Sequence, residues 1–230
     1  MKTIGLIGGM SWESSIEYYR IINEKTKEEL GGLHSAKCLM VSLDFAEVEI
    51  LQREGRWEEA DQMMLESAKR LEKGGADFIV ICTNTMHRSA GVIQANLSIP
   101  LLHIADATAK QALQSGIHKI GLLGTRFTME EDFYKGRLVE KFGLEVIIPE
   151  PEECEIIHRV IYDELVLGKI LPGSRDQYAG IIQRMVDRGA RGVILGCTEI
   201  GLLIHDQDCL VPLFDTTRIH AEAAVDFALR

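Results

Sequence analysis

Short apolar runs alternate with longer amphipathic stretches along most of this chain. The runs are rich in Ile, Val and Leu, and their length is that of strands rather than helices. Strands are therefore expected near residues 3–7, 37–43, 77–82, 100–103, 119–123, 144–148, 192–195 and 211–214. Because apolar strands separated by helices are typical of parallel sheets covered on both faces, the pattern predicts an α/β fold.

Three of the intervening stretches carry clear helix signals. They cover residues 11–29, 57–73 and 176–188. Ser11 is a suitable N-cap for the first, and Gly189 is a suitable stop after the last. We expect helices to fill most of the remaining chain between strands.

The chain contains an imperfect internal repeat. Residues 75–85 read Gly-Ala-Asp-Phe-Ile-Val-Ile-Cys-Thr-Asn-Thr, and residues 189–199 read Gly-Ala-Arg-Gly-Val-Ile-Leu-Gly-Cys-Thr-Glu. A constant offset (197 − 83 = 114) places Thr83 opposite Cys197. A hydroxyl and a thiol thus occupy equivalent positions in two halves of the chain.

Two further pairs of segments repeat in the same order. Residues 4–9 match residues 120–125 at an offset of 116 (120 − 4), and residues 99–102 match residues 211–214 at an offset of 112 (211 − 99). A period near half the chain length indicates duplication rather than a solenoid, which stacks many short repeats. The chain is therefore predicted to form two related lobes.

The boundaries of the lobes follow from two equivalent prolines. Pro100 and Pro212 each begin a predicted strand, and we expect the chain to cross between the lobes there. The first lobe would comprise residues 1–98 and 211–230, and the second residues 99–210. No low-complexity linker separates them, which predicts a tight interface.

The repeated motifs all follow predicted strands. Ligands of parallel α/β sheets bind outside the carboxyl ends of the strands, where backbone N–H groups and helix N-termini converge. We therefore expect the active site in a cleft between the lobes, lined by residues 8–11, 83–85, 124–125 and 197–198. These segments supply small hydroxyls, an amide and a thiol.

Composition and charge narrow the classes of partner. The chain has 230 residues, of which 46% are hydrophobic, so it is large enough for two cored lobes. A net charge of −10 without a basic tract argues against nucleic-acid binding, which needs clustered Lys and Arg. The apolar run at residues 4–10 is too short to span a membrane and lacks a signal-peptide cleavage pattern. We expect a soluble, cytoplasmic protein whose partner is a small molecule.

The cysteines do not suggest a disulfide framework or a metal site. They form an odd, scattered set without a Cys-x-x-Cys pair or a Cys/His cluster at zinc spacing: Cys38, Cys82, Cys154, Cys197 and Cys209. Cys197 is therefore interpreted as a catalytic residue rather than as half of a disulfide. The alternative is that it is only a small buried hydrophobic residue, as free cysteines often are.

A site with one acid/base group in each lobe suits a reaction at both faces of one carbon. Racemisation is the simplest case, because one group removes the α-proton and the opposite group returns a proton to the other face. A cysteine serves as the base when its pKa is lowered, and backbone donors at a helix start are expected to lower it here. The same donors would hold a substrate carboxylate and stabilise the enolate-like charge that develops on it.

Three segments resemble motifs of the cofactor-independent aspartate/glutamate racemase family. They are Ile-Gly-Leu-Ile-Gly-Gly-Met at residues 4–10, Thr-Asn-Thr at residues 83–85 and Gly-Cys-Thr-Glu at residues 196–199, and the likeness runs along essentially the whole chain. The resemblance implies two Rossmann-like lobes and two opposed cysteines as acid and base. It also implies no pyridoxal phosphate, no metal and, commonly, a homodimer.

The chain departs from the family pattern at the first cysteine. The usual motif is Cys-Asn-Thr, whereas this chain has Thr83-Asn84-Thr85, with Cys82 one residue too early. A shift of one residue along a strand turns the side chain to the opposite face, so Cys82 should not substitute. The resemblance therefore assigns the two catalytic positions to Cys197 and Thr83.

The resemblance also assigns a face of the substrate to each group. It implies that Cys197 deprotonates the L-enantiomer, while Thr83 reprotonates the other face. A threonine hydroxyl is a far weaker acid than a thiol, so Thr83 would relay a proton from water or from a neighbour, and slowly.

The resemblance further implies which residues hold the substrate. Asn84, Thr85, Thr125 and Thr198 would bind the α-carboxylate and the amino group, with backbone near Met10 helping.

Recognition of a side-chain carboxylate is less defined. Aspartate-specific relatives have a Lys in a segment like residues 161–168, where this chain has Val166. Gln52, Arg53 or Arg126 could compensate. Aspartate and glutamate are favoured, and a broader amino-acid range stays open.

Several alternatives remain open at this point. The scaffold could serve a one-sided enzyme with a single cysteine, such as a decarboxylase or a cis–trans isomerase, or a non-catalytic amino-acid-binding protein. Thr83 could simply satisfy backbone groups at a strand end. His87 and His103 are interpreted as capping or filling residues rather than as metal ligands.

Overall fold

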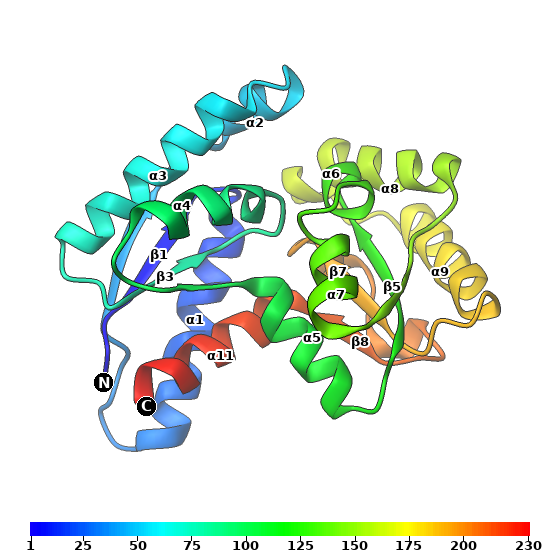
Figure 1. Ribbon diagram of the computed structural model, residues 1–230. Helices are drawn as coiled ribbons and strands as arrows, with labels where there is room; N and C mark the ends of the chain where they lie inside the picture. Colours follow the sequence, from blue (N-terminus) through cyan, green and yellow to red (C-terminus); the bar gives the residue numbers. More distant parts are fainter. The chain divides into compact units, whose positions relative to one another are not determined.

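The computed structural model describes all 230 residues as two compact α/β units (Figure 1). The first unit comprises residues 1–104 and 220–230, and the second comprises residues 105–219. Each unit contains one four-stranded sheet in which every pair of neighbours is parallel. The predicted fold class is confirmed.

The two sheets have the same strand order. The first is β2-β1-β3-β4, built from β1 (Ile4–Gly8), β2 (Cys38–Ser42), β3 (Phe78–Ile81) and β4 (Leu101–Leu102). The second is β6-β5-β7-β8, built from β5 (Lys119–Gly124), β6 (Glu145–Ile147), β7 (Val193–Gly196) and β8 (Leu213–Asp215). All eight predicted strands are present, with ends that differ by no more than two residues.

The sequence repeat is also a repeat of strand register. Gly5 pairs with Ile79 in the first sheet, and Gly121 pairs with Val193 in the second. The offsets between equivalent residues, 121 − 5 = 116 and 193 − 79 = 114, are those found in the sequence. Ile79 in turn pairs with Leu101, as Val193 does with Leu213, an offset of 112 (213 − 101). Thr83 and Cys197 therefore follow topologically equivalent strands.

Helices cover both faces of the first sheet, as Figure 1 shows. Ile7, Ile79 and Ile81 pack with α2 (Phe45–Arg53), α3 (Trp57–Lys73) and α4 (Ala90–Asn96). On the other face, Ile4, Leu6, Phe78 and Val80 pack with α1 (Trp12–Leu30) and α11 (Thr216–Leu229). Successive residues of a strand point to opposite faces, which is why these strands are apolar throughout.

The second sheet has its own helical cover. The helices that lie wholly or largely in this unit are α5 (Ile104–Gln114), α6 (Arg126–Glu130), α7 (Lys135–Phe142), α8 (Pro151–Asp163), α9 (Pro172–Asp187) and α10 (Ile200–Leu203). Side chains of α8 and α9, such as Ile157, Ile161 and Ile181, form one buried cluster with Val193 and Leu195.

The clear helix predictions are confirmed. Ser11 caps α1, since its side-chain oxygen accepts the Ser14 N–H at 3.4 Å. The helix predicted at residues 57–73 is α3, with identical ends. Helix α9 begins four residues earlier than predicted because Pro172 occupies its first turn, where a missing N–H costs nothing.

The division into units differs from the predicted lobe boundaries. The chain leaves the first unit after Ile104 and returns at His220, rather than crossing at residues 98/99 and 210/211. The reason is strand pairing, because β4 completes the first sheet beside β3 and β8 completes the second beside β7. Each proline-led strand thus ends a sheet instead of starting the next one.

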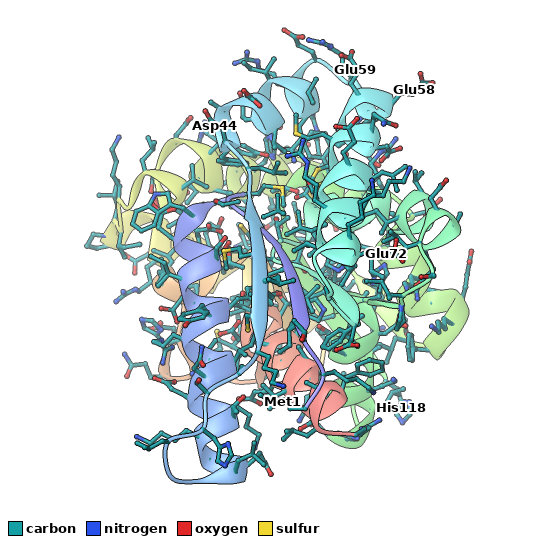
Figure 2. The ribbon with its side chains drawn as sticks, turned by 90° about the vertical axis from the view of Figure 1, so that its left-hand side faces the viewer. Met1, Asp44, Glu58, Glu59, Glu72 and His118 are labelled. Carbon is teal, nitrogen blue, oxygen red and sulfur yellow. The ribbon has the colours of Figure 1, made fainter.

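The carboxyl ends of β1 and β2 lie at one edge of the first sheet. Figure 2 shows Asp44 just beyond β2 at this edge, at the same end as Glu58 and Glu59 of α3, whereas Met1 lies at the opposite end. Asp44 caps α2 by accepting the Ala46 N–H at 3.0 Å. The starts of α2 and α3 therefore lie at the end of this unit where the parallel topology predicts ligands to bind.

Gly9 has no room for a side chain. Its φ is +89°, and an added Cβ would lie 2.1 Å from the Leu43 carbonyl oxygen. Gly75 also has a positive φ, +95°, but nothing lies within 4 Å of its added Cβ. Both glycines therefore have a strained backbone conformation for any other residue, but only at Gly9 would an added side chain also collide with the backbone.

We predict that Gly9→Ala destabilises the first unit far more than Gly75→Ala. Gly75→Ala should cost about 1–2 kcal/mol, the usual strain of a left-handed residue. Gly9→Ala should cost at least about 3 kcal/mol, because the β1–α1 loop or residue 43 must also move. Urea-unfolding midpoints of both variants, followed by circular dichroism, measure the difference; equal midpoints would contradict the close approach.

Candidate active site

The first half-site lies where β1 and β3 end side by side. The Cys82 N–H donates to the Ile7 carbonyl at 2.9 Å, which continues the sheet pairing one residue past β3. Ser14 Oγ donates to the Cys82 carbonyl at 3.1 Å and joins α1 to the same strand end. The loop of residues 8–11 and the Thr83-Asn84-Thr85 segment are therefore neighbours in this unit.

Cys82 points away from Thr83, as its position in the strand predicts. It is fully buried in the cluster with Phe78 and Val80 on the face covered by α1 and α11. Burial raises the pKa of its thiol far above the usual range. Cys82 is therefore a core residue, and that it does not replace the family's first cysteine stays a prediction.

The three residues of the first motif are held differently. Thr83 is partly exposed, and its carbonyl accepts a hydrogen bond from Nδ1 of His87 at 2.7 Å. Asn84 and Thr85 are 2% and 5% exposed, and Thr85 begins the short 3-10 helix η1 (Thr85–Ser89). The hydroxyl of Thr83 thus sits at the turn from strand to helix.

Met10 and Gln52 lie in the same unit as Thr83. Met10 is buried in the cluster that also contains Met86. Gln52, on α2, is 5% exposed, and its Nε2 lies 3.1 Å from the Met86 sulfur. Helix α2 is thereby joined to the segment that directly follows Thr85.

The second half-site lies where β5 and β7 end. Gly124 pairs with Gly196, so Thr125 and Cys197 follow paired residues on neighbouring strands. Thr125 is 5% exposed and caps α6, accepting the Thr128 N–H at 3.4 Å. The structure therefore brings Thr125 and Cys197 to one edge of this sheet.

The glycine of the Gly-Cys-Thr-Glu motif permits this close approach. A Cβ on Gly196 would lie 2.6 Å from the Leu123 carbonyl oxygen, and a Cβ on Gly124 would lie 2.9 Å from the Gly196 carbonyl oxygen. Any side chain at either position would push the two strand ends apart.

Cys197 is hydrogen-bonded to a buried carboxylate. Its Sγ donates to Oε2 of Glu199 at 3.0 Å, and Oγ1 of Thr198 donates to the same oxygen at 2.5 Å. Glu199 is only 5% exposed. Thiol, hydroxyl and carboxylate thus form one compact group directly after β7.

The surroundings hold Cys197 in its thiol form. Burial is the largest effect that raises the pKa of Cys197 well above the usual range, followed by the negative charge of Glu199 and the hydrogen bond to it. The backbone N–H groups of Thr198 and Glu199 lower the pKa, but they are outweighed. The expectation that backbone donors give a low-pKa cysteine is therefore wrong.

Glu199 and His87 are the two residues whose contacts the sequence analysis did not foresee. Glu199 stands in the Gly-Cys-Thr-Glu motif, two residues after the thiol, where a turn lets its side chain reach back. His87 lies four residues after Thr83 and reaches the Thr83 carbonyl in the same way. In both cases the signal is a polar side chain at turn spacing from a candidate catalytic residue.

The basic residues considered for a side-chain carboxylate are in solvent. Arg53 lies 3.7 Å from Glu49, and Arg126 lies 4.0 Å from Glu155, with half or more of each arginine side chain exposed. Val166 packs against the buried cluster of the second sheet. No group of three or more His, Cys, Asp or Glu side chains is arranged to hold a metal ion, and no helix is long and apolar enough to cross a membrane.

We predict that Glu199→Gln lowers the pKa of Cys197. Removing the carboxylate charge removes the second-largest cause of the raised pKa, so more thiolate forms near neutral pH. Iodoacetamide should alkylate Cys197 about 3- to 10-fold faster at pH 8, as measured by peptide mass spectrometry.

Cys209 offers a matched control in the same unit. Burial, followed by the charge of Asp208, raises its pKa to about 11. Asp208→Asn should therefore speed alkylation of Cys209 and leave Cys197 unchanged. An unaltered rate at Cys197 in Glu199→Gln would show that the carboxylate does not control the thiol.

Comparison with known proteins shows the family to which the chain belongs. Residues 7–224 match the family model for Asp/Glu/hydantoin racemases. The chain is 25% identical over 171 residues to the broad specificity amino-acid racemase RacX of Bacillus subtilis (strain 168), covering 73% of this chain and 72% of that protein.

Two solved structures are similar over the full length of both chains. One, from Yersinia pestis and provisionally assigned as an Asp/Glu racemase, is 56% identical with a TM-score of 0.94 and covers 100% of each chain. The other, an aspartate racemase homologue from Pyrococcus horikoshii OT3, is 35% identical with a TM-score of 0.85 and covers 100% of each chain. The chain belongs to the Asp/Glu/hydantoin racemase family and is an isomerase of the racemase type.

Proposed function

We propose that this enzyme is a cofactor-independent amino-acid racemase in which Cys197 and Thr83 serve opposite faces of one α-carbon. The observation that carries the proposal is the repeated strand register, which makes the positions after β3 and β7 equivalent. Membership of the racemase family supports the reaction type. Aspartate and glutamate are the favoured substrates.

In the proposed forward reaction, Cys197 acts on the L-enantiomer. The thiol first passes its proton to Glu199, whose Oε2 already accepts the Sγ–H hydrogen bond at 3.0 Å. The resulting thiolate, stabilised by the backbone N–H groups of Thr198 and Glu199, then removes the α-proton. After this step Glu199 and Cys197 each carry one proton, and the substrate is a carbanion.

Thr83 then protonates the opposite face of the carbanion. Its hydroxyl proton forms the new Cα–H bond, and the hydroxyl is restored by a proton from water or from a neighbouring group. Glu199 gives up the proton that it received from Cys197 to water, so the cycle neither gains nor loses a proton. Because a threonine hydroxyl is a very weak acid, this step is expected to limit the overall rate. Asn84, Thr85, Thr125 and Thr198 are proposed to hold the α-carboxylate and the amino group, with the Met10 backbone, and to stabilise the enolate-like charge.

Substrate range is the least constrained part of the proposal. RacX is a racemase of broad specificity, which favours testing neutral amino acids beside the acidic ones. The lysine expected for an aspartate clamp is replaced by Val166, and Arg53 and Arg126 are exposed. Gln52 is the best-buried polar candidate for a side-chain carboxylate.

A one-sided enzyme is the second candidate, and Thr83 in place of a cysteine is its specific support. Such an enzyme would exchange the α-proton of one enantiomer without inversion, or would release carbon dioxide from a malonate-type acid. A true racemase has an equilibrium constant of one, so its kcat/KM must be equal in the two directions. Saturable binding without exchange would instead indicate a binding protein.

The homodimer stays a prediction, which sedimentation equilibrium tests.

The function is tested by measuring D-enantiomer formation from aspartate, glutamate and a neutral amino-acid panel by chiral chromatography. Cys197→Ala should lower the rate by about 10²- to 10⁴-fold, the usual contribution of a positioned acid/base group. If the wild-type protein forms no D-product from any amino acid, the racemase proposal fails.

We predict opposite effects for two substitutions at Thr83. Thr83→Cys restores the family's Cys-Asn-Thr motif and should raise the rate of D-product formation about tenfold or more, because a thiol is the stronger acid. Thr83→Ala should abolish D-product while L-substrate still exchanges its α-proton with D₂O, as followed by NMR.

Cys82→Ala is the matched control for these variants. It removes the neighbouring thiol from the core and should leave the D-product rate within about threefold. A large loss in Cys82→Ala, or undiminished D-product in Thr83→Ala, would contradict the assignment of the second face to Thr83.

A further inference from the structure

Three buried histidine rings cluster beside the Thr83 segment in the first unit. The His87 ring centroid lies 4.7 Å from that of His103 and 5.5 Å from that of His220. The three residues are 2%, 6% and 0% exposed, respectively. Imidazoles this deeply buried need defined hydrogen-bond partners, which fix the position of each proton.

The hydrogen bonds of His87 specify one tautomer. The Ile104 N–H donates to Nε2 at 3.1 Å, so Nε2 carries a lone pair. In the neutral ring the proton is then on Nδ1, and Nδ1–H donates to the Thr83 carbonyl at 2.7 Å. His87 therefore bridges the end of β3 to the residue at which the chain leaves the first unit.

His220 is hydrogen-bonded to the segment of residues 102–104, which also contains the Ile104 N–H that binds His87. Its Nε2 lies 2.9 Å from the Leu102 carbonyl, and its Nδ1 lies 2.8 Å from the Tyr18 hydroxyl. Carbonyl acceptance places the proton of the neutral ring on Nε2, so Tyr18 donates to Nδ1. The segment of residues 102–104 is thus hydrogen-bonded to His220 at Leu102 and to His87 at Ile104.

We propose that His87 is a positioning residue that aims the Thr83 hydroxyl. Regular sheet pairing ends with the Cys82 N–H, and Thr83 begins the turn into η1. The direction of the Thr83 side chain follows the orientation of its peptide group, which the Nδ1–H bond holds against residue 104. The inference rests on the proposed function, since it concerns the face of the substrate that Thr83 serves.

The same contacts exclude His87 as an acid or base for the substrate. Both ring nitrogens are engaged by backbone groups of the protein, and the side chain is 2% exposed. Proton transfer at either nitrogen would break one of these bonds. A role through Thr83 is the one that this geometry supports.

Two substitutions separate the two hydrogen bonds of His87. His87→Asn places an amide N–H near the Nδ1 position and keeps the bond to Thr83, whereas His87→Gln places an amide oxygen near the Nε2 position and keeps the bond from Ile104. We predict that His87→Gln lowers D-product formation about 10- to 100-fold, the usual cost of losing an orienting group. Hydrogen exchange of L-substrate in D₂O, which depends on Cys197, should stay within about threefold.

The predicted pattern distinguishes positioning from a general structural role. His87→Asn should retain D-product formation within about fivefold, and the exposed His118→Gln serves as a neutral control. Equal losses of D-product and of L-substrate exchange in His87→Gln, or an Asn variant as impaired as the Gln variant, would overturn the proposal.

A measurement on the wild-type protein tests the inference even if the variants fail to fold. Long-range ¹H–¹⁵N NMR of the histidine rings should show His87 as the Nδ1–H tautomer from pH 6 to pH 8. An Nε2–H tautomer or a doubly protonated ring would overturn the inference. If wild-type protein formed no D-product, the proposed function would fail, while the tautomer would still report on the bond to Thr83.

Discussion

The parallel pairing of the two central strands in each sheet is the constraint on which the candidate site depends. β1 pairs with β3, and β5 pairs with β7, in equivalent registers. Parallel pairing puts the carboxyl ends of both strands at one edge, so each glycine-containing turn after the first strand lies beside the polar motif after the second. Gly124 and Gly196 show how tight this arrangement is, since neither has room for a Cβ.

The half-site after β7 is built to keep a thiol protonated. The Cys197 proton points to a carboxylate that is itself buried, and Thr198 donates to the same oxygen. A cysteine in these surroundings is a poor resting nucleophile. In the proposed mechanism it becomes a base only when its proton moves to Glu199. In that proposal the thiolate forms within a hydrogen-bonded group rather than through a permanently low pKa. The half-site after β3 has a hydroxyl at the equivalent position, and a histidine ring is hydrogen-bonded to the backbone carbonyl of the same residue.

Much of the fold could be predicted from the chain because its signals are local. Apolar runs marked the eight strands, Ser11 marked the start of α1, and the spacing of Thr83 and Cys197 revealed the repeat. The boundaries of the units could not be predicted in the same way, because β4 is only two residues long and its partner is decided by tertiary pairing with β3.

The identity of the candidate site residues could be predicted from the sequence, but their protonation states could not. A motif can name Cys197, but the raised pKa of its thiol depends on burial and on how the Glu199 side chain turns back, neither of which the sequence shows. The link between His87 and Thr83 likewise depends on Ile104, seventeen residues further along the chain. Strand positions follow from local pattern, whereas protonation states follow from contacts between distant segments.

In the proposed mechanism, two different groups exchange protons with opposite faces of one α-carbon. The most direct test is the isotopic content of both enantiomers at low conversion of unlabelled L-substrate in D₂O, measured by mass spectrometry after chiral separation. A two-group mechanism predicts D-product that carries deuterium at the α-carbon, because its new hydrogen comes from the Thr83 side. D-product that retains the original protium would mean that one group serves both faces, which contradicts the proposed roles of Cys197 and Thr83.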